Sequence, residues 1–148
     1  MRTINRAVWH CSADREGSLD GKDAAYINRV HKKRGFRKIG YHIVYLPDGT
    51  RQFGRGRNEI GAHAKGYNRT SIGLCYIGGL DKYGNPKDTR TEAQKKAMRQ
   101  DKELLDYLFP GINHVGHRDL SVDLDGDGVI SKYEWMKACP CFDVATEF

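Results

Sequence analysis

Strand-like and helix-like segments alternate along this chain, and no other feature limits its fold as strongly. Strands are expected where β-branched and aromatic residues cluster, and helices where apolar residues recur every three or four positions. These patterns predict strands at 3–10, 40–46, 71–77 and 112–116, a hairpin return at 50–53, and helices at 20–34, 91–109 and 131–138. Because strands and helices are interleaved, we expect an α/β fold whose layers surround one sheet.

The length and composition indicate a single domain over residues 1–148. Hydrophobic residues make up 39% of the chain, which is enough to fill one core. No apolar run is long enough to cross a bilayer, so stable membrane insertion is not expected. The N-terminal residues lack the apolar stretch of a secretory signal peptide. Four cysteines are too few for a disulfide scaffold, so we expect some of them to bind metal or take part in catalysis.

The charge of the chain is unevenly distributed. Residues 123–134 carry a net charge of −3, so the rest of the chain carries +9. A basic body suits a polyanionic partner such as nucleic acid, an acidic membrane or an anionic wall polymer, although a solvated surface explains it as well. No helix-turn-helix, zinc-finger or RNA-binding pattern is present, so a nucleic-acid partner is not expected.

Residues 123–134 read D-L-D-G-D-G-V-I-S-K-Y-E and match the twelve-residue calcium loop of an EF-hand. The preceding residues do not resemble an entering helix and no second hand follows, which favours a structural clip over a calcium sensor. A solvated acidic loop is the alternative. The expected calcium ligands are the carboxylates of Asp123, Asp125, Asp127 and Glu134 and the carbonyl of Val129.

His10, His117 and Cys139 are candidate zinc ligands. Two imidazoles and one thiolate suit zinc, and three protein ligands leave a fourth position for water, as in catalytic sites. His10 and His117 are 107 positions apart, so only the fold can bring them together. Cys141, two residues after Cys139, is a competing ligand. Cys11 is expected in the core, because it follows His10 in a strand and faces the opposite side.

A resemblance to a known family runs in order along nearly the whole chain. It is carried by W-H-C-S-A at 9–13, G-Y-H at 40–42, D-G-T at 48–50, H-A-K-G-Y-N at 63–68, S-I-G-L-C at 71–75, G-G at 78–79, G-H-R-D at 116–119 and K-A-C-P-C-F-D at 137–143. In these segments the chain resembles the zinc-dependent N-acetylmuramoyl-L-alanine amidases. The phage lysozyme type is the most similar, and the peptidoglycan recognition proteins are related to it.

The resemblance implies a central mixed β-sheet flanked by helices, in agreement with the periodicity. It favours Cys139 over Cys141 as the zinc ligand, because the family's C-P-x-F-D pattern begins at Cys139. It leaves the division of catalytic labour between Tyr41 and Lys137 open. The implied roles are zinc ligation for His10, His117 and Cys139, catalysis for Tyr41 and Lys137, and a border of the substrate groove for His63, Lys65 and Asn68.

The implied activity is hydrolysis of the amide that joins N-acetylmuramic acid to L-alanine in peptidoglycan. A monomeric phage or prophage endolysin is expected, which waits in the host cytoplasm until release and then acts on the cell wall. A bacterial enzyme, a recognition module that does not cut, and a calcium-regulated protein are the alternatives. Two departures from the simplest phage members stand out: the calcium-type loop fills most of the 22 positions from His117 to Cys139, and no separate wall-binding domain is expected.

Overall fold

The computed structural model describes all residues from 1 to 148 and contains one five-stranded sheet. The strand order is β4-β3-β5-β1-β7, and β3–β4 is the one antiparallel pair. The mixed central sheet that the resemblance implies is therefore confirmed. The strands are β1 (Arg6–Cys11), β3 (Ile43–Tyr45), β4 (Arg51–Phe53), β5 (Ser71–Tyr76) and β7 (Asn113–Gly116).

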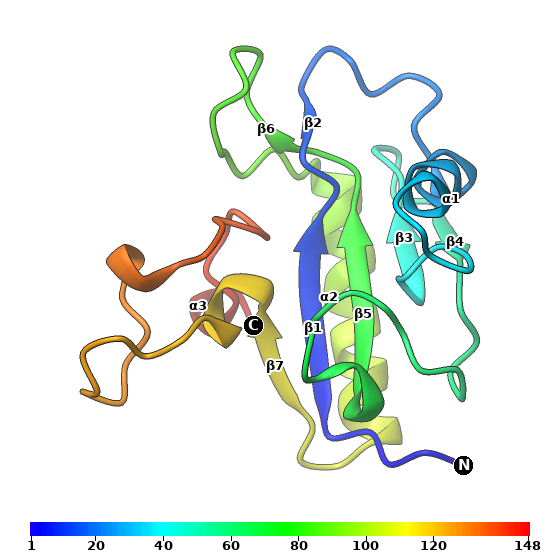
Figure 1. Ribbon diagram of the computed structural model, residues 1–148. Coiled ribbons are helices and arrows are strands. Elements are labelled where there is room, and N and C mark those ends of the chain that lie inside the picture. Colours follow the sequence, from blue (N-terminus) through cyan, green and yellow to red (C-terminus); the bar gives the residue numbers. More distant parts are fainter.

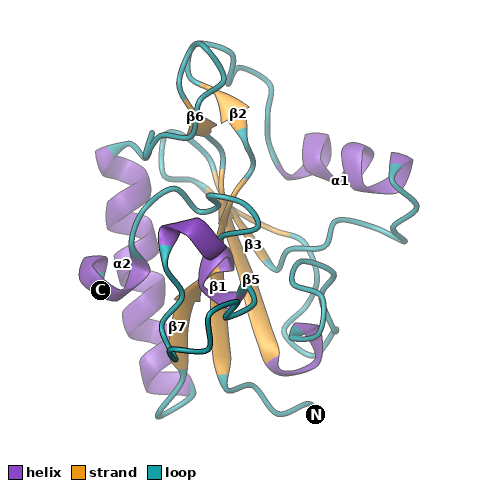
Figure 2. Ribbon diagram, turned by 60° about the vertical axis from the view of Figure 1, so that its left-hand side comes forward, coloured by secondary structure: helices purple, strands orange, loops and turns teal.

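Helices cover both faces of this sheet. Figure 1 shows α2 behind the strands, and Figure 2 shows α1 and α2 on opposite sides of them. No helix is both long enough and apolar enough to span a membrane. The remaining elements are α1 (Ala24–Lys33), α2 (Glu92–Leu108), α3 (Val144–Glu147), the 3-10 turns η1 (Asn68–Thr70), η2 (His117–Leu120) and η3 (Lys132–Glu134), and a parallel ribbon of β2 (Asp14–Arg15) and β6 (Gly79–Leu80).

Capping side chains fix where the two long helices begin. Asp23 accepts a hydrogen bond of 2.8 Å from the N–H of Tyr26, so α1 starts at Ala24 rather than at residue 20. Thr91 Oγ1 accepts from the N–H of Gln94 at 3.0 Å, and Gln94 Oε1 accepts from the N–H of Thr91 at 2.9 Å. This reciprocal pair is the capping box that the spacing predicts at the start of α2.

The helix expected at 131–138 is wrong, because the structure has only the turn η3 there. The buried carboxylate of Glu134 accepts hydrogen bonds from the N–H of Leu124 and from the N–H and hydroxyl of Ser131. These bonds tie the turn to the preceding acidic loop. The backbone of Trp135 is extended, with φ −64° and ψ 124°, so the helix cannot continue beyond Glu134. The expectation also missed α3, β2 and β6, which are too short to leave a periodic pattern.

Two apolar cores lie on the two faces of the sheet. Ala7, Trp9 and Cys11 of β1 belong to the larger core, which includes Met98 and Leu105 of α2. Because alternate residues of a strand face opposite sides, His10 projects away from this core, toward the face that α1 covers. Cys11 is buried as expected. The smaller core contains Ile27 of α1 with Ile39, Val44, Cys75 and Ile77.

Gln94 joins α2 to the ends of two neighbouring strands. Its side chain is fully buried, and its amide nitrogen donates to the carbonyls of Tyr45 and Ile77 at 3.1 Å each. The carbonyl of Tyr45 also accepts from the N–H of Ile77 at 3.0 Å, whereas the carbonyl of Ile77, just after β5, accepts from Gln94 alone. The side chain therefore satisfies one buried acceptor that the backbone leaves open and gives a second acceptor an additional bond.

We predict that Gln94→Leu lowers the free energy of unfolding by about 2–4 kcal/mol, because it leaves the carbonyl of Ile77 unpaired and removes the Gln94 half of the capping box. Gln100→Leu makes the same chemical change at an exposed position of α2 and should cost about 0.5 kcal/mol or less. Urea denaturation of both variants measures the difference. Equal midpoints for the two would contradict the assigned role of Gln94.

Candidate active site

Parallel pairing of β1 with β7 brings His10 and His117 together. Trp9 pairs with Gly116, so His10 near the end of β1 and His117 just after β7 lie side by side at the carboxyl edge of the sheet. The ring centroids of His10 and His117 are 4.6 Å apart. The carboxyl ends of parallel strands are where α/β proteins form ligand sites. The pairing of two adjacent strands thus brings together His10 and His117, which are 107 positions apart along the chain.

Backbone hydrogen bonds hold Cys139 at the same edge. The N–H of Arg118 donates to the carbonyl of Cys139 at 2.8 Å, and the N–H of Cys11 donates to its sulfur at 3.2 Å. The sulfur lies 3.8 Å from Nδ1 of His10. These contacts therefore hold the sulfur of Cys139 next to the ring of His10.

His10, His117 and Cys139 form a donor set that fits zinc. Their ligand atoms lie within 4.8 Å of one another, and all three side chains line one groove. Burial lowers the pKa of His117 to about 4, helped by the charge of Lys137. Burial also lowers the pKa of His10 well below its usual value, with added repulsion from His63. Both imidazoles are therefore neutral at pH 7, as metal ligands must be.

The structure separates the two cysteines of the C-P-C segment. Cys141 has a positive φ of 68°, and its sulfur lies 3.9 Å from the sulfur of Cys11. The hydrogen bond between the Cys11 and Cys139 side chains raises the pKa of Cys11 to about 12. The hydrogen bond with Cys11 likewise raises the pKa of Cys141. Cys141 is thus a protonated thiol paired with Cys11 and lies outside the cluster of His10, His117 and Cys139.

His63 contacts His10 directly. Its Nδ1 is 2.9 Å from Nε2 of His10, and its Nε2 is 3.3 Å from the hydroxyl of Ser71. A Cβ atom at Gly73 would lie 2.6 Å from the His63 ring, so glycine at this point of β5 makes room for it. The hydrogen bond occupies Nε2 of His10 and leaves Nδ1 directed toward Cys139. This arrangement of His63 fits a residue that orients a metal ligand.

The groove contains both residues that the resemblance implies are catalytic. It is about 680 Å³ in volume and includes Tyr41 and Lys137. The Tyr41 ring centroid is 5.0 Å from that of His10, and burial raises the pKa of its phenol well above the usual value. Lys137 is exposed and forms no ion pair with a carboxylate. Tyr41 can therefore donate a proton or hydrogen bond, and Lys137 brings a free positive charge.

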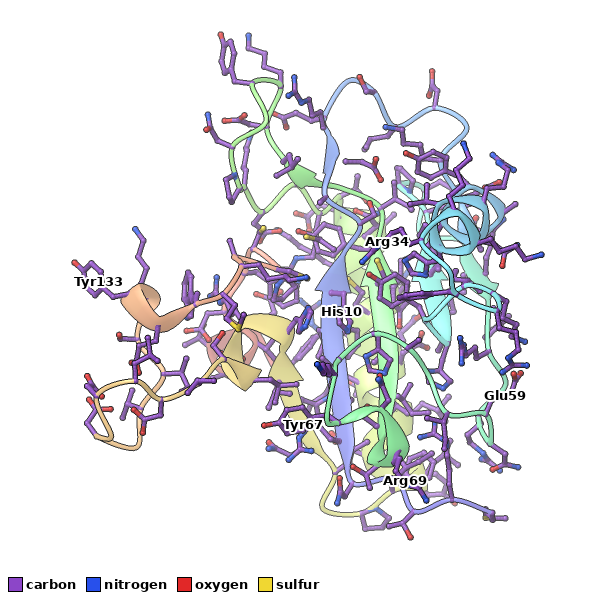
Figure 3. All side chains as sticks on the ribbon, viewed as in Figure 1. His10, Arg34, Glu59, Tyr67, Arg69 and Tyr133 are labelled. Carbon is purple, nitrogen blue, oxygen red and sulfur yellow. The ribbon has the colours of Figure 1, made fainter.

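The loop from residue 54 to 70 forms one wall of the groove. Lys65 is exposed there, whereas the Asn68 side chain accepts hydrogen bonds from the N–H groups of His63 and Ala64. Asn68 thereby fixes the backbone that carries His63. Figure 3 shows this loop in front of the sheet, with Tyr67 in its lower part and with His10 and Arg34 above it.

Sequence reasoning did not single out several groove residues. His31 is buried, and its Nδ1 accepts from the N–H of Gly40 at 2.9 Å. A histidine within an otherwise apolar helix stripe was the one signal that could have indicated it. Arg34, Phe36 and Pro86 gave no signal, because only the tertiary structure brings the end of α1 and the loop after β6 to the groove.

The acidic loop over residues 123–134 is folded into a compact turn and has no flanking α-helices. The turn η2 precedes it and η3 ends it. Asp123 accepts from the N–H groups of Gly126 and Gly128, and Asp127 accepts from that of Val129. Both glycines have positive φ, at 74° and 82°. One carboxylate oxygen from each of four residues lies within 4.8 Å of the others: Asp123, Asp125, Asp127 and Glu134.

Comparisons with known proteins agree with this architecture. The family model Amidase_2, described as N-acetylmuramoyl-L-alanine amidase, matches residues 1–141. An endolysin of Klebsiella phage KP32 is 36% identical over 135 residues, covering 91% of this chain and 79% of that protein. The structure of the amidase LysC from Clostridium intestinale has a TM-score of 0.74 at 23% identity, covering 99% of this chain and 82% of that chain. A Drosophila PGRP-LB mutant in complex with tracheal cytotoxin has a TM-score of 0.73 at 21% identity, covering 99% and 80%.

The two structural likenesses establish a shared fold. The match to the family model and the identity to the phage endolysin extend over more than nine tenths of the chain. The match to the family model includes β1 and the segments that contain His117 and Cys139. The chain therefore belongs to the N-acetylmuramoyl-L-alanine amidase family and is an enzyme of that class.

Proposed function

We propose that this amidase uses zinc to hydrolyse the amide between N-acetylmuramic acid and L-alanine in peptidoglycan. The observation that carries the proposal is the convergence of His10, His117 and Cys139 on the wall of one groove. An ion held by these three side chains would face the groove, where a substrate can reach it. Zinc held there would supply a Lewis acid that polarises the amide carbonyl and activates water for attack.

The remaining groove residues have roles that follow from their chemistry. The positive charge of Lys137 stabilises the negative charge that develops on the carbonyl oxygen. The protonated phenol of Tyr41 donates a hydrogen bond to the same oxygen or transfers a proton to the departing nitrogen. His63 holds the ring of His10, so that Nδ1 faces the sulfur of Cys139. Lys65 and Asn68 border the path of the substrate.

The biological role that fits is that of a phage or prophage endolysin. The 36% identical relative in Klebsiella phage KP32 is an endolysin. We assign the same role to this chain, as a monomer that remains in the host cytoplasm until release to the cell wall. A recognition module that does not cut is the alternative, since a Drosophila PGRP-LB in complex with tracheal cytotoxin has the same fold. The thiol of Cys139 beside two neutral imidazoles argues for hydrolysis.

Calcium bound by residues 123–134 is a further part of the proposal. The backbone N–H of Asp127 lowers the pKa of Asp125, but desolvation by the surrounding loop, hydrogen bonds shared with the carboxyls of Asp127 and Asp123, and the charge of Glu134 outweigh it and raise that pKa. Four close carboxylates repel one another, and a divalent cation relieves that repulsion. The loop joins His117 to Cys139, so an ordered loop helps to fix the position of Cys139 and Lys137.

The two cysteines of the C-P-C segment allow a matched test of the ligand set. We expect Cys139→Ala to lose zinc and to lower the hydrolysis of purified cell walls by about a hundredfold or more. Cys141→Ala should keep its zinc and most of its activity, since its sulfur contacts Cys11 instead. Atomic absorption measures the zinc and turbidity measures wall lysis. Loss of zinc from Cys141→Ala alone would move the ligand to Cys141.

Tyr41→Phe and Lys137→Gln test the groove chemistry. Each should retain zinc but lower the rate of wall hydrolysis by about 10²–10³, because each removes a group that acts on the reacting atoms. Tyr107→Phe and Lys96→Gln change the same residue types at exposed positions of α2 and should leave the rate unchanged. Product analysis for new N-terminal alanine identifies the bond that is cut. Full activity in either groove variant would remove that residue from the mechanism.

Added calcium should stabilise the zinc-loaded protein. At a hundredfold excess over its Kd, we expect a rise in Tm of about 5–10 °C. Asp125→Asn should abolish the rise, since Asp125 is exposed and bonds only within the loop. Asp20→Asn, at an exposed position outside the loop, should retain it. A Tm that does not respond to calcium in the parent protein would exclude calcium binding.

A further inference from the structure

The inserted segment forms a second, basic cavity beside the active-site groove. This cavity has a volume of about 490 Å³. It shares Pro86, Lys137, Ala138 and Cys141 with the groove, so the two hollows adjoin. The additional lining residues are Arg118, Lys132 and Trp135. Lys132 and Trp135 lie between His117 and Cys139, in the insertion by which this chain departs from the simplest phage members.

Three positive charges meet at this cavity without an acidic partner. Arg118, Lys132 and Lys137 form no ion pair within 4.0 Å and donate no side-chain hydrogen bond to the protein. The nearby carboxylates are otherwise engaged: Asp119 accepts from the N–H of Gly116, and Glu134 accepts from Leu124 and Ser131. The donors at the cavity are therefore free for a ligand, and their mutual repulsion favours an anion.

The indole of Trp135 orders one of these charges. The guanidinium carbon of Arg118 lies 3.9 Å from the centroid of the Trp135 ring, within cation–π range. A guanidinium held flat on an aromatic ring keeps its edge donors available in a fixed plane. Such a planar fork suits a carboxylate, which accepts two parallel hydrogen bonds.

We propose that this cavity is a subsite for a carboxylate of the peptidoglycan stem peptide. The inference rests on the proposed function, which places the muramyl–alanine amide in the adjoining groove. On one side of that amide the glycan offers hydroxyl and acetamido groups. On the other side the stem peptide offers carboxylates, and only these match three unpaired cations. Lys137 borders both hollows and separates the reacting amide from the carboxylate.

The experiment uses the free stem tripeptide L-Ala-γ-D-Glu-diaminopimelate and the same peptide with its carboxylates amidated. The chain has two tryptophans, and Trp9 is fully buried in the core, so Trp135 reports binding by its fluorescence without any need for cleavage. We expect the free acid to change the fluorescence and to bind about fivefold more tightly than the amide, on the scale of a partly exposed ion pair. Trp135→Phe should lose the signal.

Lys132→Gln should abolish most of the preference for the free acid, and Lys132→Arg should retain it. Lys96→Gln removes the same charge from an exposed position of α2 and should retain the preference. Equal affinity for the two peptides in the parent protein would overturn the subsite, as would competition by inorganic phosphate at equal concentration. A parent protein that binds the free acid but cuts no muramyl peptide would instead contradict the proposed function, so the two failures are distinguishable.

Discussion

The parallel pairing of β1 with β7 is the constraint on which the candidate site depends. Its register places Trp9 opposite Gly116, and one residue further each chain carries a histidine. A slip of one residue would turn His10 toward the core beneath α2 and Trp9 toward the groove. The apolar contacts of Ala7, Trp9 and Cys11 with that core prevent the slip. Packing on one face of the sheet thus keeps the side chain of His10 directed into the groove on the other face.

Close backbone approaches complete the site around this pair of strands. A Cβ atom at Gly116 would lie 2.7 Å from Pro140, so glycine allows the C-P-C segment to pack against β7. The hydroxyl of Tyr76 donates to the carbonyl of Pro140 at 2.7 Å, which ties the same segment to β5. Gly73 similarly makes room for His63. These contacts hold Cys139 and His63 against His10 from opposite directions.

The segment between His117 and Cys139 carries negative charge in its first part and positive charge in its last part. Its first part gathers carboxylates around a compact turn, and its last part presents Lys132 and Trp135 beside the groove. Figure 3 shows Tyr133 of this segment at the outer edge of the molecule, where it is 95% exposed. The buried side chain of Glu134 links the two parts through its bonds to Leu124 and Ser131. The acidic turn is therefore joined by hydrogen bonds to the segment that carries Lys132 and Trp135.

The sequence alone determined the features that depend on local patterns. The main strands, the two long helices and the capping box of Thr91 and Gln94 follow from periodicity and propensity, which neighbouring residues set. Motif resemblance also named His10, His117 and Cys139 together. The tertiary structure decided what depends on distant contacts: the 3-10 turn at Lys132–Glu134, the pairing of Cys141 with Cys11, the hydrogen bond of His63 to His10, and the basic cavity. These contacts depend on how the sheet and its loops pack. The spacing of the residues along the chain therefore carries no periodic signal that could predict them.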